Sequence, residues 1–270
     1  MDEQAARQTI VEIGRLLYER GHVVASDGNL SIRLADDRII ATPTMLSKGR
    51  LTEDSLAITD LQGAPLNDRR ASSELKMHLL VYQEREDVRA VCHAHPAHGT
   101  AFAVAGLAID EPVLSEVILA LGCVPLAPYG TPSTAELTDR MRPLVKHHNA
   151  LLMANHGAVA YGKDLWQAFD RMETLDHTAR ITILARALGG SNKLPADAIE
   201  KLINVREQAG FLTEAARCQS CGYLEESQIA CGTGERAKSN DSNVAANGNG
   251  KISLTREDLI DLLAQAAQLK

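Results

Sequence analysis

Three histidines stand where they could bind a single metal ion. His93 and His95 follow the apolar run 88–91, and His156 follows a second apolar run, 150–154. Residues i and i+2 of a strand point to the same face, so His93 and His95 can converge on one ion. A third imidazole from a distant strand would complete a three-histidine site with an open coordination position. The pattern predicts a catalytic divalent cation, most simply Zn²⁺, acting as a Lewis acid.

A glutamate strengthens this interpretation, although other ligands are available. Glu74 opens a predicted helix, 74–82, that leads into the first histidine strand. A carboxylate beside the open position of a metal could act as a general acid and base. The alternative is an ordinary first-turn glutamate, which the helix dipole favours. The chain has nine histidines, and His98, His147 and His148 are the alternative ligands.

The composition narrows the class of protein. The chain has 270 residues, 45% of them hydrophobic, which is enough for one large domain or two small ones. Its formal net charge of −7 argues against a nucleic-acid-binding surface. We see no apolar run long enough to span a membrane, and the polar start 1–4 argues against a signal peptide. An odd number of cysteines, five, suits a reducing cytoplasm.

Periodicity and turn residues predict alternating helices and hairpins. The expected helices are 4–20, 73–84, 98–105, 134–146, 165–188 and 195–208, with a partly helical stretch at 111–119. The expected strands are 28–34, 38–42, 56–60, one ending at His93, a short extended piece at 123–126, and 150–154, which continues through a tight hairpin over 155–162. These strands are not spaced by regular βαβ units. We therefore expect an α/β sandwich whose sheet is mixed or mainly antiparallel and is covered by helices.

The character of the chain changes near residue 210. We divide it into a main domain at 1–210, a cysteine-containing segment with a flexible linker at 211–253, and an amphipathic helix at 254–270. Cys218, Cys221 and Cys231 offer three thiols without an obvious fourth ligand, so free thiols are favoured over a metal or iron–sulfur site. Cys92 and Cys123 are expected to pack as small apolar residues.

Six short motifs occur in the order of a known family. They are Gly28-Asn29-Leu30-Ser31, Thr42-Pro43-Thr44, Ser72-Ser73-Glu74, His93-Ala94-His95, Ala127-Pro128-Tyr129-Gly130 and Asn155-His156-Gly157. Over about residues 5–210 the chain resembles the class II aldolase/adducin family, most closely the L-fuculose-1-phosphate aldolases. The resemblance implies a class II aldolase-like α/β/α sandwich. It also implies metal-dependent retro-aldol cleavage of L-fuculose-1-phosphate or L-rhamnulose-1-phosphate to dihydroxyacetone phosphate and lactaldehyde.

The resemblance also assigns roles to individual residues. It implies Zn²⁺ on His93, His95 and His156, and Glu74 as the acid/base beside the ion. It implies a site for the substrate phosphate that is built from Asn29, Thr44, Ser72 and Ser73. The two serines could instead cap the following helix, and Asn29 could be only a turn residue. A four-fold homotetramer with active sites between neighbouring subunits is implied as well.

The chain departs from the family pattern at three places. The family usually has glycine at the position of Met45, and the fuculose aldolases use tyrosines near Leu114 and Ala209. Tyr129 and Tyr223 are the candidates to substitute for those tyrosines.

Related activities on the same fold remain alternatives. A pentulose-phosphate 4-epimerase typically has aspartate where Glu74 stands, so Glu74 favours the aldolase. A methylthio-sugar-phosphate dehydratase is another possibility. A non-enzymatic, adducin-like scaffold would be marked by loss of metal ligands, and all three histidines are present.

The C-terminal segment resembles an encapsulation peptide. Such peptides direct enzymes into bacterial microcompartments by packing an apolar stripe on a shell protein or another cargo enzyme. The stripe of the helix at 254–269 is Leu259, Leu262, Leu263, Ala266 and Ala267. The resemblance implies a cytoplasmic enzyme that resides in a microcompartment lumen. The alternative is a helix that docks on its own tetramer.

Overall fold

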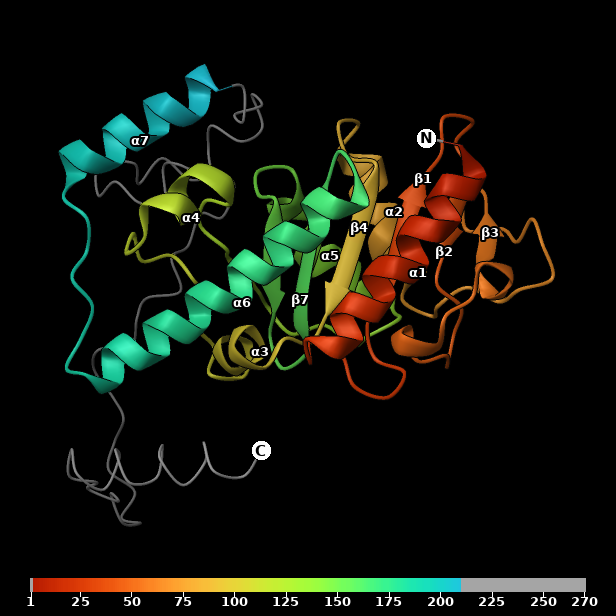
Figure 1. Cartoon of the computed structure of the whole chain (residues 1–270), viewed down its shortest axis with the longest axis horizontal. Coiled ribbons are helices and arrows are strands. Elements are labelled where there is room, and N and C mark those ends of the chain that lie inside the picture. Colours follow the sequence, from red (N-terminus) through yellow and green to blue (C-terminus); the bar gives the residue numbers. More distant parts are fainter. Residues whose placement is uncertain (1, 210–270) are drawn as a thin grey trace, which may run out of the picture. The chain divides into compact units, whose positions relative to one another are not determined.

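A single mixed sheet forms the centre of the molecule (Figure 1). The computed structural model describes residues 2–209. Its strands are β1 Asn29–Arg33, β2 Ile39–Ala41, β3 Ala57–Thr59, β4 Ala90–Ala94, β5 Leu126–Ala127, β6 Ala150–Met153 and β7 Gly157–Gly162. They lie in the order β3-β2-β1-β4-β7-β6-β5. All neighbours are antiparallel except β5 and β6, which are parallel. The expected mixed, mainly antiparallel sheet is confirmed.

Helices cover both faces of this sheet. They are α1 Glu3–Glu19, α2 Leu75–Glu84, α3 Ala97–Val104, α4 Ser115–Ala120, α5 Ala135–Val145, α6 Leu165–Ala187 and α7 Ala196–Gln208. Figure 1 shows α1 and α6 in front of the sheet and α2 and α5 behind it. Two short 3₁₀ turns, η1 Lys48–Arg50 and η2 Glu53–Ser55, lie between β2 and β3. The expected α/β/α sandwich is therefore confirmed.

The alternation of side chains along the strands creates two separate cores. On β4, Cys92 belongs to the core under α1, α3 and α6, whereas Val91 belongs to the core under α2 and α5. Burying an aliphatic side chain contributes about 1.5–3 kcal/mol, so the two cores fix the register of β4. With that register, His93 lies on the same face of the sheet as Val91, beneath α2.

The predicted elements agree with the structure except near their ends. The helix predicted from residue 73 begins at Leu75. The backbone N–H of Ser72 instead donates to the carbonyl of Thr42, which keeps the preceding segment extended beside 42–44. The strand predicted at 123–126 is displaced, because Val124 forms an isolated bridge with Ile109 and regular pairing starts at Leu126.

Several composition-based expectations can also be compared with the described residues. Cys92 and Cys123 are buried, as expected for small apolar side chains. None of the described helices is long and apolar enough to cross a bilayer. The segments 211–253 and 254–270, with Cys218, Cys221 and Cys231, lie outside the described residues.

Candidate active site

Two strand ends bring the three histidines together. His93 lies in β4 opposite Val159 of β7, and His95 follows one residue after β4 ends. His156 lies in the tight turn between β6 and β7. The ring centroids are 4.8–5.2 Å apart, and one ligand atom from each ring falls within 4.8 Å of the others. The convergence that the spacing predicts is therefore present.

The geometry of the cluster fits a divalent cation. The Nδ1 of His93 lies 2.8 Å from the carbonyl of Ala158 and donates to it, so its Nε2 is a free acceptor. That atom lies 3.2 Å from the Nε2 of His95. Two nitrogens bound tetrahedrally at 2.0–2.1 Å from zinc would be about 3.3 Å apart. The spacing of these two nitrogens therefore matches that of two ligands of one ion.

The protonation of His95 also suits a metal ligand. Burial, followed by the neighbouring imidazoles, lowers the pKa of His95 to about 4, so the ring is neutral at pH 7. Its Nδ1 faces a carboxylate oxygen of Asp27 at 3.5 Å. A carboxylate behind a histidine orients its ring and fixes the tautomer that ligates.

Glu74 lies directly beside the histidines. Its residue is the N-cap of α2, and its carboxylate oxygens lie 3.3 Å from the Nε2 of His93 and 3.1 Å from the Nε2 of His156. Burial raises the pKa of Glu74, but the two imidazoles outweigh this effect and the net pKa lies well below its usual range. A charged carboxylate therefore stands where a proton could be moved next to a bound ion.

A series of hydrogen-bonded, buried polar groups lies on the interior side of Glu74. The sequence patterns discussed above do not predict this series. Asn29 donates to Glu74 at 2.9 Å, and the ring of His78 contacts the Asn29 oxygen at 2.5 Å. The hydroxyl of Ser31 lies 2.7 Å from both His78 and Tyr82. One signal was available: positions 74, 78 and 82 repeat every four residues, which places them on one face of a helix.

The predicted phosphate residues lie on three adjacent segments. Thr44 and Ser72 are brought together because the 42–44 and 70–72 segments run antiparallel, with the N–H of Thr44 donating to the carbonyl of Arg70. The hydroxyl of Ser72 accepts from the N–H of Glu74 at 3.3 Å, but the N-cap of α2 is Glu74 and has no side-chain cap, so the two serines do not cap this helix. Ser73 is exposed. The Asn29 side chain is directed to Glu74, not toward these residues.

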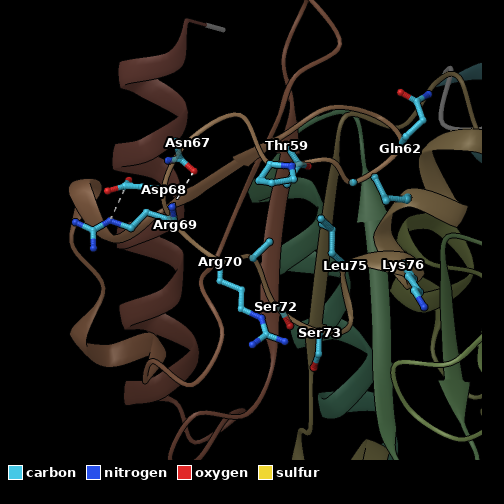
Figure 2. Close-up of a pocket in the computed structure, with 14 residues that line it drawn as sticks. Thr59, Gln62, Asn67, Asp68, Arg69, Arg70, Ser72, Ser73, Leu75 and Lys76 are labelled. Carbon is cyan, nitrogen blue, oxygen red and sulfur yellow. Dashed lines mark hydrogen bonds and ion pairs between the residues drawn. The ribbon is translucent and has the colours of Figure 1, made fainter.

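A cavity of about 490 Å³ adjoins two of these residues (Figure 2). Ser72 and Ser73 line it together with Arg69, Arg70 and Lys76, but none of the three histidines does. Figure 2 shows the Arg70 side chain extending beside Ser72. Asp68 also lines the cavity and lies 4.0 Å from Arg69, but the three basic side chains outnumber it, and such a wall suits an anion.

The backbone at Met45 retains the shape that glycine would favour. Met45 has φ +59°, in the left-handed region, and its side chain is 84% exposed. The loop therefore keeps the glycine-like turn despite the larger side chain, which points into solvent.

The remaining candidate residues lie elsewhere. His98 pairs with Asp176, and His148 is buried against the carbonyl of Leu144. Neither these two nor His147 belongs to the metal-ligand cluster found among the described residues. Tyr129 is about half exposed, and Tyr223 lies outside the described range.

Comparison with known proteins agrees with the fold. A family model for the class II aldolase and adducin N-terminal domain matches residues 8–183. A 3-oxo-tetronate 4-phosphate decarboxylase of Haemophilus influenzae is 34% identical over 186 residues, covering 67% of this chain and 88% of that protein. An L-fuculose phosphate aldolase of Methanococcus maripaludis is 34% identical over 180 residues, covering 66% and 96%.

Solved structures show the same architecture. The structure of YgbL from Klebsiella pneumoniae superposes with a TM-score of 0.70 at 34% identity and covers 75% of this chain and 99% of its own. An L-fuculose 1-phosphate aldolase superposes with a TM-score of 0.72 at 28% identity and covers 78% and 99%. The chain therefore belongs to the class II aldolase and adducin family.

Proposed function

We propose that the chain is a divalent-metal-dependent lyase that cleaves a ketose 1-phosphate between the carbons α and β to its carbonyl group. The proposed substrate is L-fuculose-1-phosphate or L-rhamnulose-1-phosphate, and the products are dihydroxyacetone phosphate and lactaldehyde. One observation carries the proposal: the Glu74 carboxylate lies 3.1–3.3 Å from ring nitrogens of two of the three clustered histidines. A base beside a cation site is what proton transfer next to a carbonyl requires.

His93, His95 and His156 would hold the ion, with Zn²⁺ as the first candidate. When bound, the ion would stabilise the negative charge that develops on the carbonyl oxygen and the adjacent hydroxyl oxygen of the substrate. Glu74 would return a proton to the carbon that loses its bond in the cleavage direction, and remove it in the reverse direction. Thr44, Ser72 and Ser73 would bind the phosphate, aided by the N-terminus of α2. Asn29, whose amide is engaged by Glu74 and His78, would hold the Glu74 carboxylate in place instead of binding the phosphate.

Decarboxylation is a second candidate, favoured by a specific observation. Relatives about one third identical include 3-oxo-tetronate 4-phosphate decarboxylases as well as aldolases. Loss of CO₂ next to a 3-oxo group leaves the enediolate of dihydroxyacetone phosphate, as retro-aldol cleavage does. Retro-aldol cleavage must also remove a hydroxyl proton from the departing carbon, whereas decarboxylation does not. The position near which the fuculose aldolases place a tyrosine is Leu114 here, a residue without an ionisable group.

One assay separates the two reactions. Zinc-loaded protein is incubated with each ketose 1-phosphate or with 3-oxo-tetronate 4-phosphate, and dihydroxyacetone phosphate is followed together with the aldehyde or CO₂. Product from a ketose phosphate supports the aldolase, and product from the keto acid alone replaces it with the decarboxylase. His95→Ala and Glu74→Gln should each abolish turnover, with bound zinc retained only in Glu74→Gln. No product from any substrate, despite bound zinc, would leave the epimerase and the dehydratase.

We also propose a homotetramer and a location inside a microcompartment in the cytoplasm. The tetramer follows from the family, and its mass in solution is measured by light scattering. The location depends on the amphipathic pattern at 254–270, which lies outside the described residues. Deleting residues 252–270 should abolish co-purification with shell protein while leaving turnover intact. Unchanged co-purification would end the targeting proposal.

A further inference from the structure

A continuous line of hydrogen bonds runs from the interior to Glu74. Its members are Tyr82, Ser31, His78, Asn29 and Glu74, and the four contacts measure 2.7, 2.7, 2.5 and 2.9 Å in that order. The four residues behind Glu74 are almost completely inaccessible, with exposures of 0–3%. A buried polar network of this kind is stable only when each member is satisfied, so its members are not interchangeable.

The direction of each bond follows from the orientation of the Asn29 amide. Its NH₂ group donates to Glu74, so its oxygen faces His78. An amide oxygen can only accept, so the Nε2 of His78 must carry the hydrogen. The Nδ1 of a neutral His78 is then an acceptor, which makes Ser31 the donor to it. Ser31 in turn accepts from the hydroxyl of Tyr82.

The burial of His78 keeps this direction. Burial lowers the pKa of His78 to about 3, so the ring is neutral over the working range of an enzyme. A neutral ring donates through one nitrogen and accepts through the other, which transmits the orientation from Ser31 to Asn29. Asn29, held in this way, has only one orientation in which it can donate to Glu74.

We infer that His78 is a positioning residue that acts through Asn29 to hold the Glu74 carboxylate in place for proton transfer. The inference rests on the proposed role of Glu74. His78 forms no hydrogen bond with the three histidines and does not line the cavity of Figure 2. Loss of His78 should therefore lower kcat and leave the affinity for the phosphorylated substrate nearly unchanged.

The first test does not depend on any substrate. NMR of ¹⁵N-histidine-labelled, zinc-loaded protein reports which ring nitrogen carries a hydrogen. We expect His78 at pH 7 to be neutral with its hydrogen on Nε2, and we expect substitution of His78 to identify its signals. A hydrogen on Nδ1, or on both nitrogens, would reverse or interrupt the line of hydrogen bonds and overturn the inference.

The second test uses the side-chain amides as partial mimics of imidazole. Gln places its amide nitrogen near the position of Nε2, so His78→Gln keeps the donor to Asn29. Asn reaches only the position of Nδ1, so His78→Asn removes that donor, and His78→Leu removes both polar groups. We expect His78→Gln to retain kcat within about threefold. His78→Asn and His78→Leu should lose about 10–100-fold, as is typical for groups behind a metal site, with KM within about threefold.

Matched controls separate positioning from folding. His148 is also a buried histidine, but its ring bonds the carbonyl of Leu144 and takes no part in this hydrogen-bond network. His148→Gln and His148→Leu should therefore leave kcat unchanged. Wild-type kcat in folded, zinc-loaded His78→Leu, or an equal loss in His78→Gln and His78→Leu, would refute the inference. If the wild type turns over none of the substrates, the proposed function fails. The tautomer of His78 would still show whether the hydrogen-bond network runs in the inferred direction.

Discussion

At Met45, a single residue combines an unfavourable backbone with an exposed side chain. Its φ of +59° suits glycine, and its side chain is 84% exposed, so substitution removes almost no packing. Met45→Val should destabilise the protein by about 1–2 kcal/mol, because a β-branched residue tolerates this region poorly. Met45→Gly should be neutral or slightly stabilising, because relief of strain is offset by the greater freedom of glycine in the unfolded chain.

Urea unfolding of the two Met45 variants measures this difference. Since both substitutions remove the same exposed side chain, the gap between them reports how each residue tolerates the left-handed backbone, together with the greater freedom of glycine in the unfolded chain. Equal midpoints for Met45→Val and Met45→Gly would mean that the loop does not hold a left-handed residue at this position.

Residue types and spacing predicted the histidine cluster but not its supports. His93, His95 and His156 could be chosen because strand periodicity and apolar flanks place them at strand ends. The partner of Asn29 could not be predicted, because it depends on the pairing of β1 with β4 and on the packing of α2 above them. The apolar residues on both sides of His78 predict an ordinary core residue, so the sequence does not single it out.

At the scale of the elements, β4 and β7 approach so closely that the metal site requires a residue without a side chain at position 157. A Cβ on Gly157 would lie 2.5 Å from Cδ2 of His95 and 2.7 Å from the carbonyl oxygen of Ala94. The second contact is with backbone, which cannot move cheaply. Gly157→Ala should therefore displace His95 and weaken zinc binding by at least about tenfold.

Competition with a zinc chelator measures that affinity. Gly106→Ala is the matched control: Gly106 has φ +72° and open space around its Cβ position. That substitution should cost about 1 kcal/mol of stability through backbone strain and leave zinc affinity unchanged. An unaltered zinc affinity in Gly157→Ala would show that His95 tolerates the displacement.

A carboxylate on α6 satisfies the start of α3, the helix that follows His95. One oxygen of Asp176 accepts from the N–H groups of His98 and Gly99 at 2.9 and 3.0 Å, and the other lies 3.0 Å from Nδ1 of His98. Asp176→Ala should destabilise the protein by about 2–4 kcal/mol, because it leaves buried donors without an acceptor. Asp176→Asn keeps one acceptor oxygen and should cost less. Urea unfolding tests this, and equal losses in the two variants would contradict it.

The elements themselves were more predictable than their arrangement. The amphipathic period of α1 and the apolar runs of β4 and β6 are local, so their positions follow from the sequence. The parallel pairing of β5 with β6 could not be predicted, because β5 has only two residues, too few to show a period. The start of α2 was misplaced because the residue Ser72 before it is held by a hydrogen bond to Thr42, which is distant in the sequence.

At the scale of the whole molecule, buried histidines should make folding sensitive to mild acid. Burial lowers the pKa of His78 to about 3 and that of His148 to about 4, whereas an unfolded histidine titrates near 6.5. Below pH 6.5 these two histidines therefore bind protons in the unfolded chain but not in the folded protein. The stability that these two neutral histidines contribute is present above pH 6.5 and is lost as the pH falls below it. The two groups together should lower the free energy of unfolding by about 3–4 kcal/mol between pH 7 and pH 5.

Urea unfolding at pH 7, 6 and 5 in the presence of a chelator tests this without the competing release of zinc. His95, whose pKa burial also lowers to about 4, adds to the loss in the same direction. The contribution of His148 is therefore isolated by comparing the variant with the wild type. His148→Gln should reduce the loss in free energy of unfolding between pH 7 and pH 5 by about 2 kcal/mol. This reduction must appear whatever the substitution does to stability at pH 7, because only the number of protons bound on unfolding enters the slope. A His148→Gln variant with the wild-type slope would mean that His148 is protonated in the folded protein. In that case its bond to the carbonyl of Leu144, and not its burial, would control its charge.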